Sequence, residues 1–269
     1  MIRLIATDLD GTLLAGKSNL PEENIAALRR AMDTGVRLVL SSGRIIEAMT
    51  GLADKIGVNA PLIVYNGAMV YDYKNDEILY GKTIPWEIAA EVIRHVETTG
   101  VHVQACPGRG YFFREKNRWT DYYEDKVGPK GTAVHMPLSD WLHQDVYKLL
   151  CLGESHLLEG LVRDLTPLFP DVSFIKSADT HLEVVARGVD KADGLRFLSA
   201  QLGIDPSEIM AFGDEQNDLG MLDFAGEGYL MENAPEPLRR LPYKIAPRNT
   251  DCGVARIVNL YLNEGRMGG

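Results

Sequence analysis

Two aspartates separated by one leucine follow the apolar opening of the chain, in the stretch TDLDGTLL. The first six residues are mostly apolar and predict a short buried strand that ends at Asp8 and Asp10. Ionised carboxylates at the edge of a core repel each other and lose hydration, so a compensating positive charge is expected beside them. Taken alone, the pair indicates either a cation site or a turn that caps a helix.

Alternating strands and helices surround this acidic turn. A helix is predicted over residues 21–35, a strand over 36–40 that stops at Ser-Ser-Gly, a helix over 45–57 and a strand over 61–65 that ends in Asn66-Gly67. A hairpin is predicted around residues 74–76. This order is typical of a parallel sheet with helices on both faces.

From about Thr83 the pattern changes to short strands in pairs with intervening helices, one of which carries Leu158, Leu161, Leu165 and Leu168. The first pattern returns from Asp190, with a helix over 191–203, a strand over 209–213, a helix over 216–226 and a terminal helix near 253–265. We therefore predict an α/β core, residues 1–82 and 187–269, interrupted by a separate α+β domain over residues 83–186.

Polar residues follow the predicted core strands. In open parallel sheets ligands bind beyond the carboxyl ends of the strands, so these side chains should converge. They are Asp8 and Asp10, then Ser42 and Gly43, then Asp214, Asn217 and Asp218, with Lys191 at the start of the returning helix. Carboxylate oxygens suit Mg²⁺, which commonly binds one or two carboxylates, waters and a substrate phosphate.

The spacing of Asp8 and Asp10 predicts that the two carboxylates have different roles in the reaction. In an extended segment Asp8 and Asp10 face one side while Leu9 faces the other. One carboxylate can then attack phosphorus while the other donates a proton to the leaving oxygen. The alternative for Asp214 to Asp218 is a helix cap, and the alternative for Lys191 is a solvated lysine. Their joint occurrence with the first pair favours function.

The four segments resemble, in order, the four motifs of the haloacid dehalogenase-like phosphatases. They are DLDGT at residues 8–12, Ser42-Gly43-Arg44, Lys191 in RGVDKADGL, and GDEQND at residues 213–218. The chain is more narrowly similar to the Cof-type, sugar-phosphatase-like branch, with a large cap inserted between the second and third motifs. YNGA and NAPEPLRR extend the resemblance over nearly the whole length. It implies a Rossmann-like parallel-sheet core with an inserted α+β cap of the C2 type.

The resemblance also implies a role for each matched residue. Asp8 would be the nucleophile that forms an aspartyl-phosphate, and Asp10 the general acid and then the general base. Mg²⁺ would be held by the Asp8 side chain, the Asp10 carbonyl oxygen and Asp214, with Asp218 supporting the metal shell. The phosphoryl oxygens would be bound by Ser42, the Gly43 amide, Lys191 and Asn217. Many relatives have threonine at Ser42, and the hydroxyl is retained.

The predicted function is a Mg²⁺-dependent phosphatase of small phosphorylated metabolites, with sugar phosphates favoured. One alternative is a phosphomutase, which also forms an aspartyl-phosphate but returns the phosphoryl group to its substrate. Another is a non-catalytic phospho-receiver or metabolite-binding module. Arg109, Arg114 and His181 are candidates for substrate selection by the cap, and Gly81 and Gly188 for its hinges.

Composition limits the partners. The formal net charge is −10, without a block of lysine or arginine, so no nucleic-acid partner is expected. No stretch approaches the ~20 apolar residues of a membrane helix, and no targeting segment is visible. Three scattered cysteines fit reduced thiols. We expect a cytoplasmic monomer or small homo-oligomer.

Overall fold

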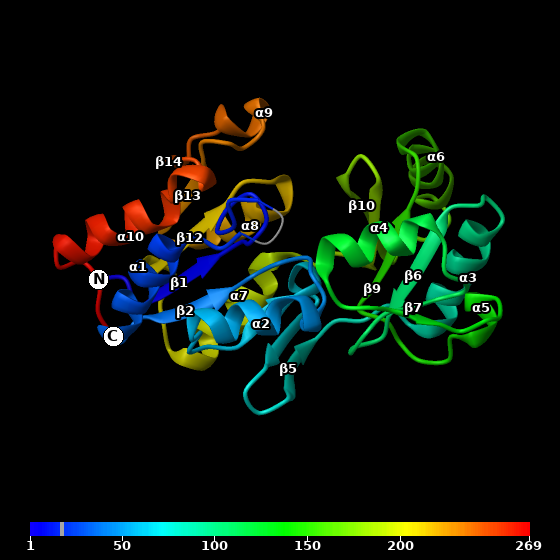
Figure 1. Ribbon diagram of the computed structural model, residues 1–269, viewed down its shortest axis with the longest axis horizontal. Coiled ribbons are helices and arrows are strands. Elements are labelled where there is room, and N and C mark those ends of the chain that lie inside the picture. Colours follow the sequence, from blue (N-terminus) through cyan, green and yellow to red (C-terminus); the bar gives the residue numbers. More distant parts are fainter. Residues whose placement is uncertain (17–18) are drawn as a thin grey trace. The chain divides into compact units, whose positions relative to one another are not determined.

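The computed structural model describes residues 1–16 and 19–269, and the chain divides into two compact units. The core unit comprises Met1–Gly43, Thr50–Tyr80 and Asp190–Gly269, and the inserted unit comprises Arg44–Met49 and Gly81–Val189. The helices and many of the strands of both units are labelled in Figure 1. We predicted a catalytic domain over residues 1–82 and 187–269 and a cap over residues 83–186. These roles of the two units stay a prediction.

The core unit is built on a parallel sheet whose five strands lie in the order β14-β13-β12-β1-β2. Leu4 at the start of β1, an inner strand, pairs with Ile209 of β12 on one side and with Arg37 of β2 on the other. All four residues of that strand are buried, as expected for a parallel strand covered on both faces. The strands are β1 (Leu4–Thr7), β2 (Arg37–Leu40), β12 (Ile209–Gly213), β13 (Glu227–Met231) and β14 (Lys244–Ala246).

Helices cover this sheet. The α1 and α10 helices lie side by side (Figure 1), and α7 contributes Leu195 and Leu198 to a core cluster that includes Leu4 and Ile209. The α2 helix begins in the inserted unit and continues into the core unit. The helices are α1 (Glu22–Asp33), α2 (Ile46–Ile56), α7 (Lys191–Leu202), α8 (Leu219–Phe224), α9 (Glu236–Arg239) and α10 (Gly253–Asn263), with short 3₁₀ turns η1 (Tyr65–Gly67), η2 (Pro206–Glu208), η3 (Gln216–Asp218) and η4 (Asn249–Asp251).

The third predicted strand departs from the expected parallel arrangement. It belongs to a separate three-stranded sheet of β3 (Leu62–Val64), β4 (Met69–Asp72) and β5 (Glu77–Gly81), and it pairs antiparallel with β4. A single parallel bridge, Ser41 to Ile63, links it to the end of β2. The predicted hairpin is present between β4 and β5. Tight connection to β4 explains the difference, because only antiparallel strands can be joined by a short turn.

The inserted unit is α+β. Its six-stranded sheet has the order β10-β11-β9-β6-β7-β8, and within it only the β7–β8 pair is recorded as parallel among the described residues. The predicted leucine-rich helix ends at Leu165, and Leu168 lies beyond it with 58% of its surface exposed. The elements are α3 (Trp86–Glu97), β6 (His102–Cys106), β7 (Phe112–Phe113), α4 (Arg118–Val127), β8 (Thr132–Ala133), α5 (Leu138–Trp141), β9 (Lys148–Leu152), α6 (Ser155–Leu165), β10 (Val172–Ala178) and β11 (His181–Ala186).

The two ends of the described chain meet beside β1. Ile2 donates its backbone N–H to the carbonyl oxygen of Arg266 at 2.8 Å, and Gly268 donates to the carbonyl oxygen of Ile2 at 3.0 Å. The adjacent positions of the termini are visible in Figure 1. Across residues 1–16 and 19–269, no helix combines the length and the apolar character that a membrane crossing requires.

Candidate active site

Three carboxylates meet at the carboxyl edge of the parallel sheet. Asp8 follows β1 and Asp214 follows β12, and these two strands are paired in parallel register. Asp218 ends the η3 turn directly after β12. One oxygen from each carboxylate lies within 4.8 Å of the others, and all three residues are buried. The expected convergence of Asp8, Asp214 and Asp218 is therefore present in the structure.

Two glycines make this close approach possible. Gly11 has a φ of +83°, and a Cβ there would lie 2.1 Å from Oδ2 of Asp214. A Cβ on Gly213 would lie 2.3 Å from the Cβ of Asp218. Any side chain at either position would displace a carboxylate of the cluster, so glycine is required for its geometry.

Lys191 provides the positive charge inside the cluster. It is the first residue of α7, and its Nζ donates to Oδ1 of Asp8 and to Oδ1 of Asp218, both at 2.6 Å. Its side chain is only 1% exposed. Burial lowers the pKa of Lys191, but the attraction of Asp218 and Asp8 outweighs burial and raises it. Lys191 is therefore a permanent cation at this site.

Asp218 is held by the backbone as well as by Lys191. Its Oδ2 accepts hydrogen bonds from the backbone N–H groups of Asp214 at 2.9 Å and Glu215 at 3.0 Å. Both carboxylate oxygens of Asp218 thus have partners within the protein. This arrangement fixes the loop after β12 and, through it, the position of Asp214.

The remaining two carboxylates are held less completely. Thr12 donates its hydroxyl to Oδ1 of Asp214 at 2.8 Å. Burial and repulsion by Asp218 nevertheless raise the pKa of Asp214 to about 7. Burial also raises the pKa of Asp8, against the attraction of Lys191 and with further repulsion from Asp218 and Asp214. Three carboxylates around one ammonium leave an excess of negative charge that favours a cation.

Asp10 lies outside this group of carboxylates. The β1 strand ends at Thr7, a turn begins at Leu9, and the Asp10 side chain is exposed whereas Asp8 is 5% exposed. The extended segment expected through Asp10 therefore stops earlier than predicted. The turn is closed by an isolated bridge between Asp10 and Leu14, which redirects the chain after Asp8.

The predicted phosphate-binding residues of the core unit are linked by Asn66. Ser42 and Gly43 follow β2, and the carbonyl oxygen of Ser42 accepts a hydrogen bond from the Asn66 N–H at 3.0 Å. The amide nitrogen of Asn217 donates to Oδ1 of Asn66 at 2.9 Å. Sequence reasoning assigned no role to Asn66 or to Thr12, because neither contact is local in the chain. The sequence signal at this position was the Asn-Gly pair after a short strand, which is typical of a turn with positive φ.

The donor set fits the Mg²⁺ that the sequence implies. Asp8 and Asp214 offer hard carboxylate oxygens close enough to share one small divalent cation. The raised pKa values of Asp8 and Asp214 also indicate that the protein by itself supplies too little positive charge to balance these carboxylates. Asp218 is engaged by Lys191 and two backbone N–H groups, which agrees with a supporting position.

The candidates in the inserted unit lie in different surroundings. Arg109 and Arg114 are exposed. His181 is 4% exposed, and its Nε2 has no hydrogen-bond partner within residues 1–16 and 19–269. Burial, with the nearby Lys126 and Lys148, lowers the pKa of His181 to about 3, so this imidazole is neutral. The proposed hinge Gly188 has a φ of +70°.

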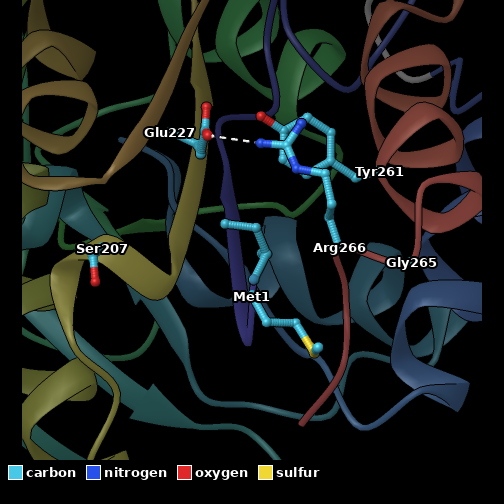
Figure 2. Close-up of a pocket in the computed structure, with 7 residues that line it drawn as sticks. Met1, Ser207, Glu227, Tyr261, Gly265 and Arg266 are labelled. Atoms are coloured by element: carbon cyan, nitrogen blue, oxygen red, sulfur yellow. Dashed lines mark hydrogen bonds and ion pairs between the residues drawn. The ribbon is translucent and has the colours of Figure 1, made fainter.

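A cavity of about 260 Å³ lies elsewhere in the core unit, near the chain ends (Figure 2). Arg266 forms an ion pair with Glu227 at 3.2 Å, and its guanidinium lies 3.8 Å from the centre of the Tyr261 ring. These contacts tie the C-terminal tail to β13. The cavity is lined by Met1, Ile2, Ser207, Glu227, Tyr261, Gly265 and Arg266, none of which was predicted to act in the reaction.

A doubly wound α/β core with clustered aspartates and a buried lysine at the strand ends defines a class of enzymes that handle anions with a metal ion. A family model described as haloacid dehalogenase-like hydrolase matches residues 5–258, and the chain belongs to this family. The resemblance expected from the four motifs is thereby confirmed, and so is the α/β fold class.

Curated relatives of this chain are named as phosphatases. An HMP-PP phosphatase from Yersinia pseudotuberculosis is 31% identical over 275 residues, covering 99% of this chain and 98% of that protein. The 5-amino-6-(5-phospho-D-ribitylamino)uracil phosphatase YitU of Bacillus subtilis is 28% identical and covers 97% of both chains. These names are consistent with a phosphoric monoester hydrolase.

Solved structures agree with the fold. A haloacid dehalogenase-like hydrolase from Bacteroides thetaiotaomicron has a TM-score of 0.88 and 28% identity, covering 97% of this chain and 99% of that one. A crystal structure from Thermotoga maritima has a TM-score of 0.86 and 30% identity, with 97% of each chain covered.

Proposed function

We propose that this protein is a Mg²⁺-dependent phosphatase that hydrolyses small phosphorylated metabolites, with sugar phosphates as the substrate class. The observation that carries the proposal is the buried contact of Lys191 with Asp8 and Asp218 at 2.6 Å, with Asp214 alongside. This constellation supplies a carboxylate nucleophile, a permanent cation and ligands for a divalent metal within a few ångströms.

Asp8 is the proposed nucleophile. A carboxylate oxygen of Asp8 attacks phosphorus, the bond between phosphorus and the ester oxygen breaks, and Asp10 gives its proton to the leaving alkoxide. A water molecule then attacks the aspartyl-phosphate, Asp10 takes the proton from that water, and the bond between phosphorus and Asp8 breaks. Asp10 is exposed and lies in a turn, which suits a group that must reach both the leaving group and water.

Lys191 has two tasks in this scheme. It neutralises Asp8, so that an anionic substrate is not repelled by the nucleophile, and it attracts the phosphoryl oxygens. Ser42, the Gly43 amide and Asn217 would donate to the same oxygens. Asp8, the Asp10 carbonyl oxygen and Asp214 would hold Mg²⁺, supported by Asp218. When bound, the metal supplies positive charge that polarises the phosphoryl group.

The inserted unit is the proposed cap that selects the substrate. It carries exposed cationic side chains such as Arg109 and Arg114, which suit an anionic or hydroxyl-rich substrate. The phosphorylated ribityl group in the name of the Bacillus subtilis relative supports a sugar-like substrate class. We place the enzyme in the cytoplasm, since all three of its cysteines are free thiols.

Release of para-nitrophenol from para-nitrophenyl phosphate tests the proposal. We expect turnover with Mg²⁺ and none in excess chelator. A phosphate-release screen of sugar phosphates and other phosphorylated metabolites then identifies the preferred ester. Absence of phosphate release from every ester in the presence of Mg²⁺ would overturn the proposal.

The two alternative functions give different outcomes in the same assays. A phosphomutase yields an isomerised sugar phosphate instead of free phosphate, which product analysis detects. A non-catalytic receiver becomes phosphorylated at Asp8 without turnover. An intact Asp10 favours hydrolysis over the receiver function, because a receiver has no need of a general acid.

A further inference from the structure

The η1 turn, Tyr65–Gly67, has an unusual backbone. Tyr65, Asn66 and Gly67 have φ values of 52°, 57° and 93°. Among the described residues, this is the one place where two adjacent non-glycine residues both have positive φ. A bulky residue such as tyrosine adopts this conformation at a cost of about 1 kcal/mol or more, so surrounding contacts must hold it.

Asn66 connects two of the predicted phosphate-binding segments. It is 3% exposed, its N–H donates to the Ser42 carbonyl oxygen, and its Oδ1 accepts from the Asn217 amide nitrogen. The side chain also lies directly against Gly43, where a Cβ would be 2.8 Å from Oδ1 of Asn66. One buried side chain therefore touches the segments after β2 and after β12.

The same turn contacts the third segment. A Cβ on Gly67 would lie 2.0 Å from the carbonyl oxygen of Asp190 and 2.9 Å from the Cα of Lys191. Asp190 is the N-cap of α7 and accepts from the Ala192 N–H at 2.7 Å. The turn thus packs against the start of the helix that carries Lys191.

The hydrogen bond from Asn217 to Oδ1 of Asn66 determines which side-chain atom of Asn217 can bind an anion. A side-chain amide has an acceptor oxygen and a nitrogen with two N–H groups. One N–H of Asn217 is directed to Asn66, so the nitrogen end is fixed and its second N–H remains a donor. Without the acceptor on Asn66, the amide can rotate and present its oxygen lone pairs to an anion, which is repulsive.

We propose that Asn66 is a positioning residue for phosphoryl binding, which acts through Asn217 by fixing the orientation of its amide. This inference rests on the proposed function. The left-handed backbone is required because it lets the Asn66 N–H reach Ser42 while its side chain reaches Asn217.

The test uses Asn66→Gly, which removes the acceptor but keeps a residue that adopts positive φ freely. The probe is inorganic phosphate, measured as a competitive inhibitor and by direct calorimetric binding at saturating Mg²⁺. We expect a loss of about 10- to 100-fold in phosphate affinity, typical of a buried hydrogen-bond network that loses one partner. The Mg²⁺ affinity should be unchanged, which would show that the carboxylate cluster of the core unit is intact.

His135→Gly is the matched control. His135 also has positive φ (57°), lies in the inserted unit and has an exposed side chain, so this variant makes the same kind of backbone change outside the core unit. We expect its phosphate affinity to equal that of the wild type. An equal loss in both variants would overturn the proposal, and so would an Asn66→Gly affinity within twofold of the wild type.

A double-mutant cycle with Asn217→Ala tests the route of the effect. If Asn66 acts through Asn217, the double variant binds phosphate no more weakly than Asn217→Ala alone. Losses that simply multiply would show that the two residues act independently and overturn the inference. If the wild-type protein hydrolyses phosphate esters and Asn66→Gly is fully active, only this inference is refuted. If the wild-type protein has no phosphatase activity, the proposed function is refuted.

Discussion

Each unit of this protein buries a lysine against carboxylate, but the two sites differ in charge and spacing. In the core unit the Lys191 ammonium lies 2.6 Å from both Asp8 and Asp218. In the inserted unit the Lys148 ammonium lies 3.5 Å from Glu183, and the side chains are 2% and 9% exposed. The core site contains three carboxylates around its lysine, whereas the other contact joins one charge of each sign.

The difference separates the proposed reactive site from a simple ion pair. Burying charges costs free energy that is recovered only when the charges are matched and hydrogen-bonded. The contact of Lys148 with Glu183 pairs its charges, and the Ser177 hydroxyl also donates to Glu183 at 3.0 Å. The core cluster keeps unmatched negative charge, and burial together with repulsion by Asp218 raises the pKa of Asp214 to about 7. A cluster with unbalanced negative charge retains affinity for a further cation. The proposed phosphatase reaction requires this property.

The largest expected effect follows from neutralising one charge at the core site. Asp8→Asn should lower turnover of para-nitrophenyl phosphate by about 1,000-fold or more, because an amide is a poor nucleophile. The matched control removes both charges of the inserted unit's pair, Lys148→Met with Glu183→Gln, and should stay within about threefold of the wild type on this small ester. An Asp8→Asn variant with more than a tenth of wild-type turnover would remove the distinction between the two sites.

Metal binding should distinguish the two sites next. Chelation should stop turnover and added Mg²⁺ should restore it, while Ca²⁺, which prefers more ligands, should support it poorly. At 100 times its dissociation constant, Mg²⁺ should stabilise the folded protein by about 2.7 kcal/mol. Differential scanning calorimetry measures this as a higher unfolding temperature. Asp214→Asn should abolish the increase, and full activity in excess chelator would contradict the assignment.

The stability of the two units should depend on pH with opposite sign in metal-free protein. The folded pKa of Asp214, about 7, lies above its ordinary value of 3.8 because of burial and Asp218. Its contribution to stability is therefore full below pH 3.8 and is lost as the pH rises through 7. Burial lowers the pKa of His102 in the inserted unit from 6.5 to about 4, so its contribution is full above pH 6.5 and is lost as the pH falls toward 4.

All three tryptophans, Trp86, Trp119 and Trp141, lie in the inserted unit, so their fluorescence reports its unfolding separately. We expect acidification from pH 6.5 to 4 to destabilise that unit by about 1–3 kcal/mol. Hydrogen exchange of α7 and β12 amides reports the core unit, which should lose stability as the pH rises from about 4 to about 7. Asp214→Asn should flatten the core profile and leave the fluorescence profile unchanged. Identical profiles for the two probes would contradict this separation.

The smallest effects are expected from exposed residues of the inserted unit. Arg109→Ala and Arg114→Ala should change the relative rates on a panel of sugar phosphates by about two- to tenfold, since each removes one exposed charge. Their rates on para-nitrophenyl phosphate should remain near the wild-type rate. Uniform loss across the whole panel would indicate a structural unit that takes no part in substrate choice.

The sequence by itself determined the order of the elements and most of the chemistry-bearing residues. Alternating apolar strands and amphipathic helices predicted the parallel core, because a strand covered on both faces must be apolar throughout. The polar residues after β1 and β12 and the lysine that begins α7 could be found because parallel strands end at one edge of the sheet. The third strand was predicted, but its antiparallel pairing with β4 was not, because periodicity does not encode which strands pair.

Only the tertiary structure decided how those residues are held. Asp218 engages two backbone N–H groups, and Thr12 reaches Asp214 across 202 positions of sequence. The left-handed turn at Asn66 brings Ser42 and Asn217 together across a separation of 175 positions, the difference of their residue numbers. Such contacts arise from the three-dimensional path of the chain and leave no local period or spacing in the sequence. For that reason the convergence of the polar groups could be predicted from the sequence, whereas the residues that hold them in place could not.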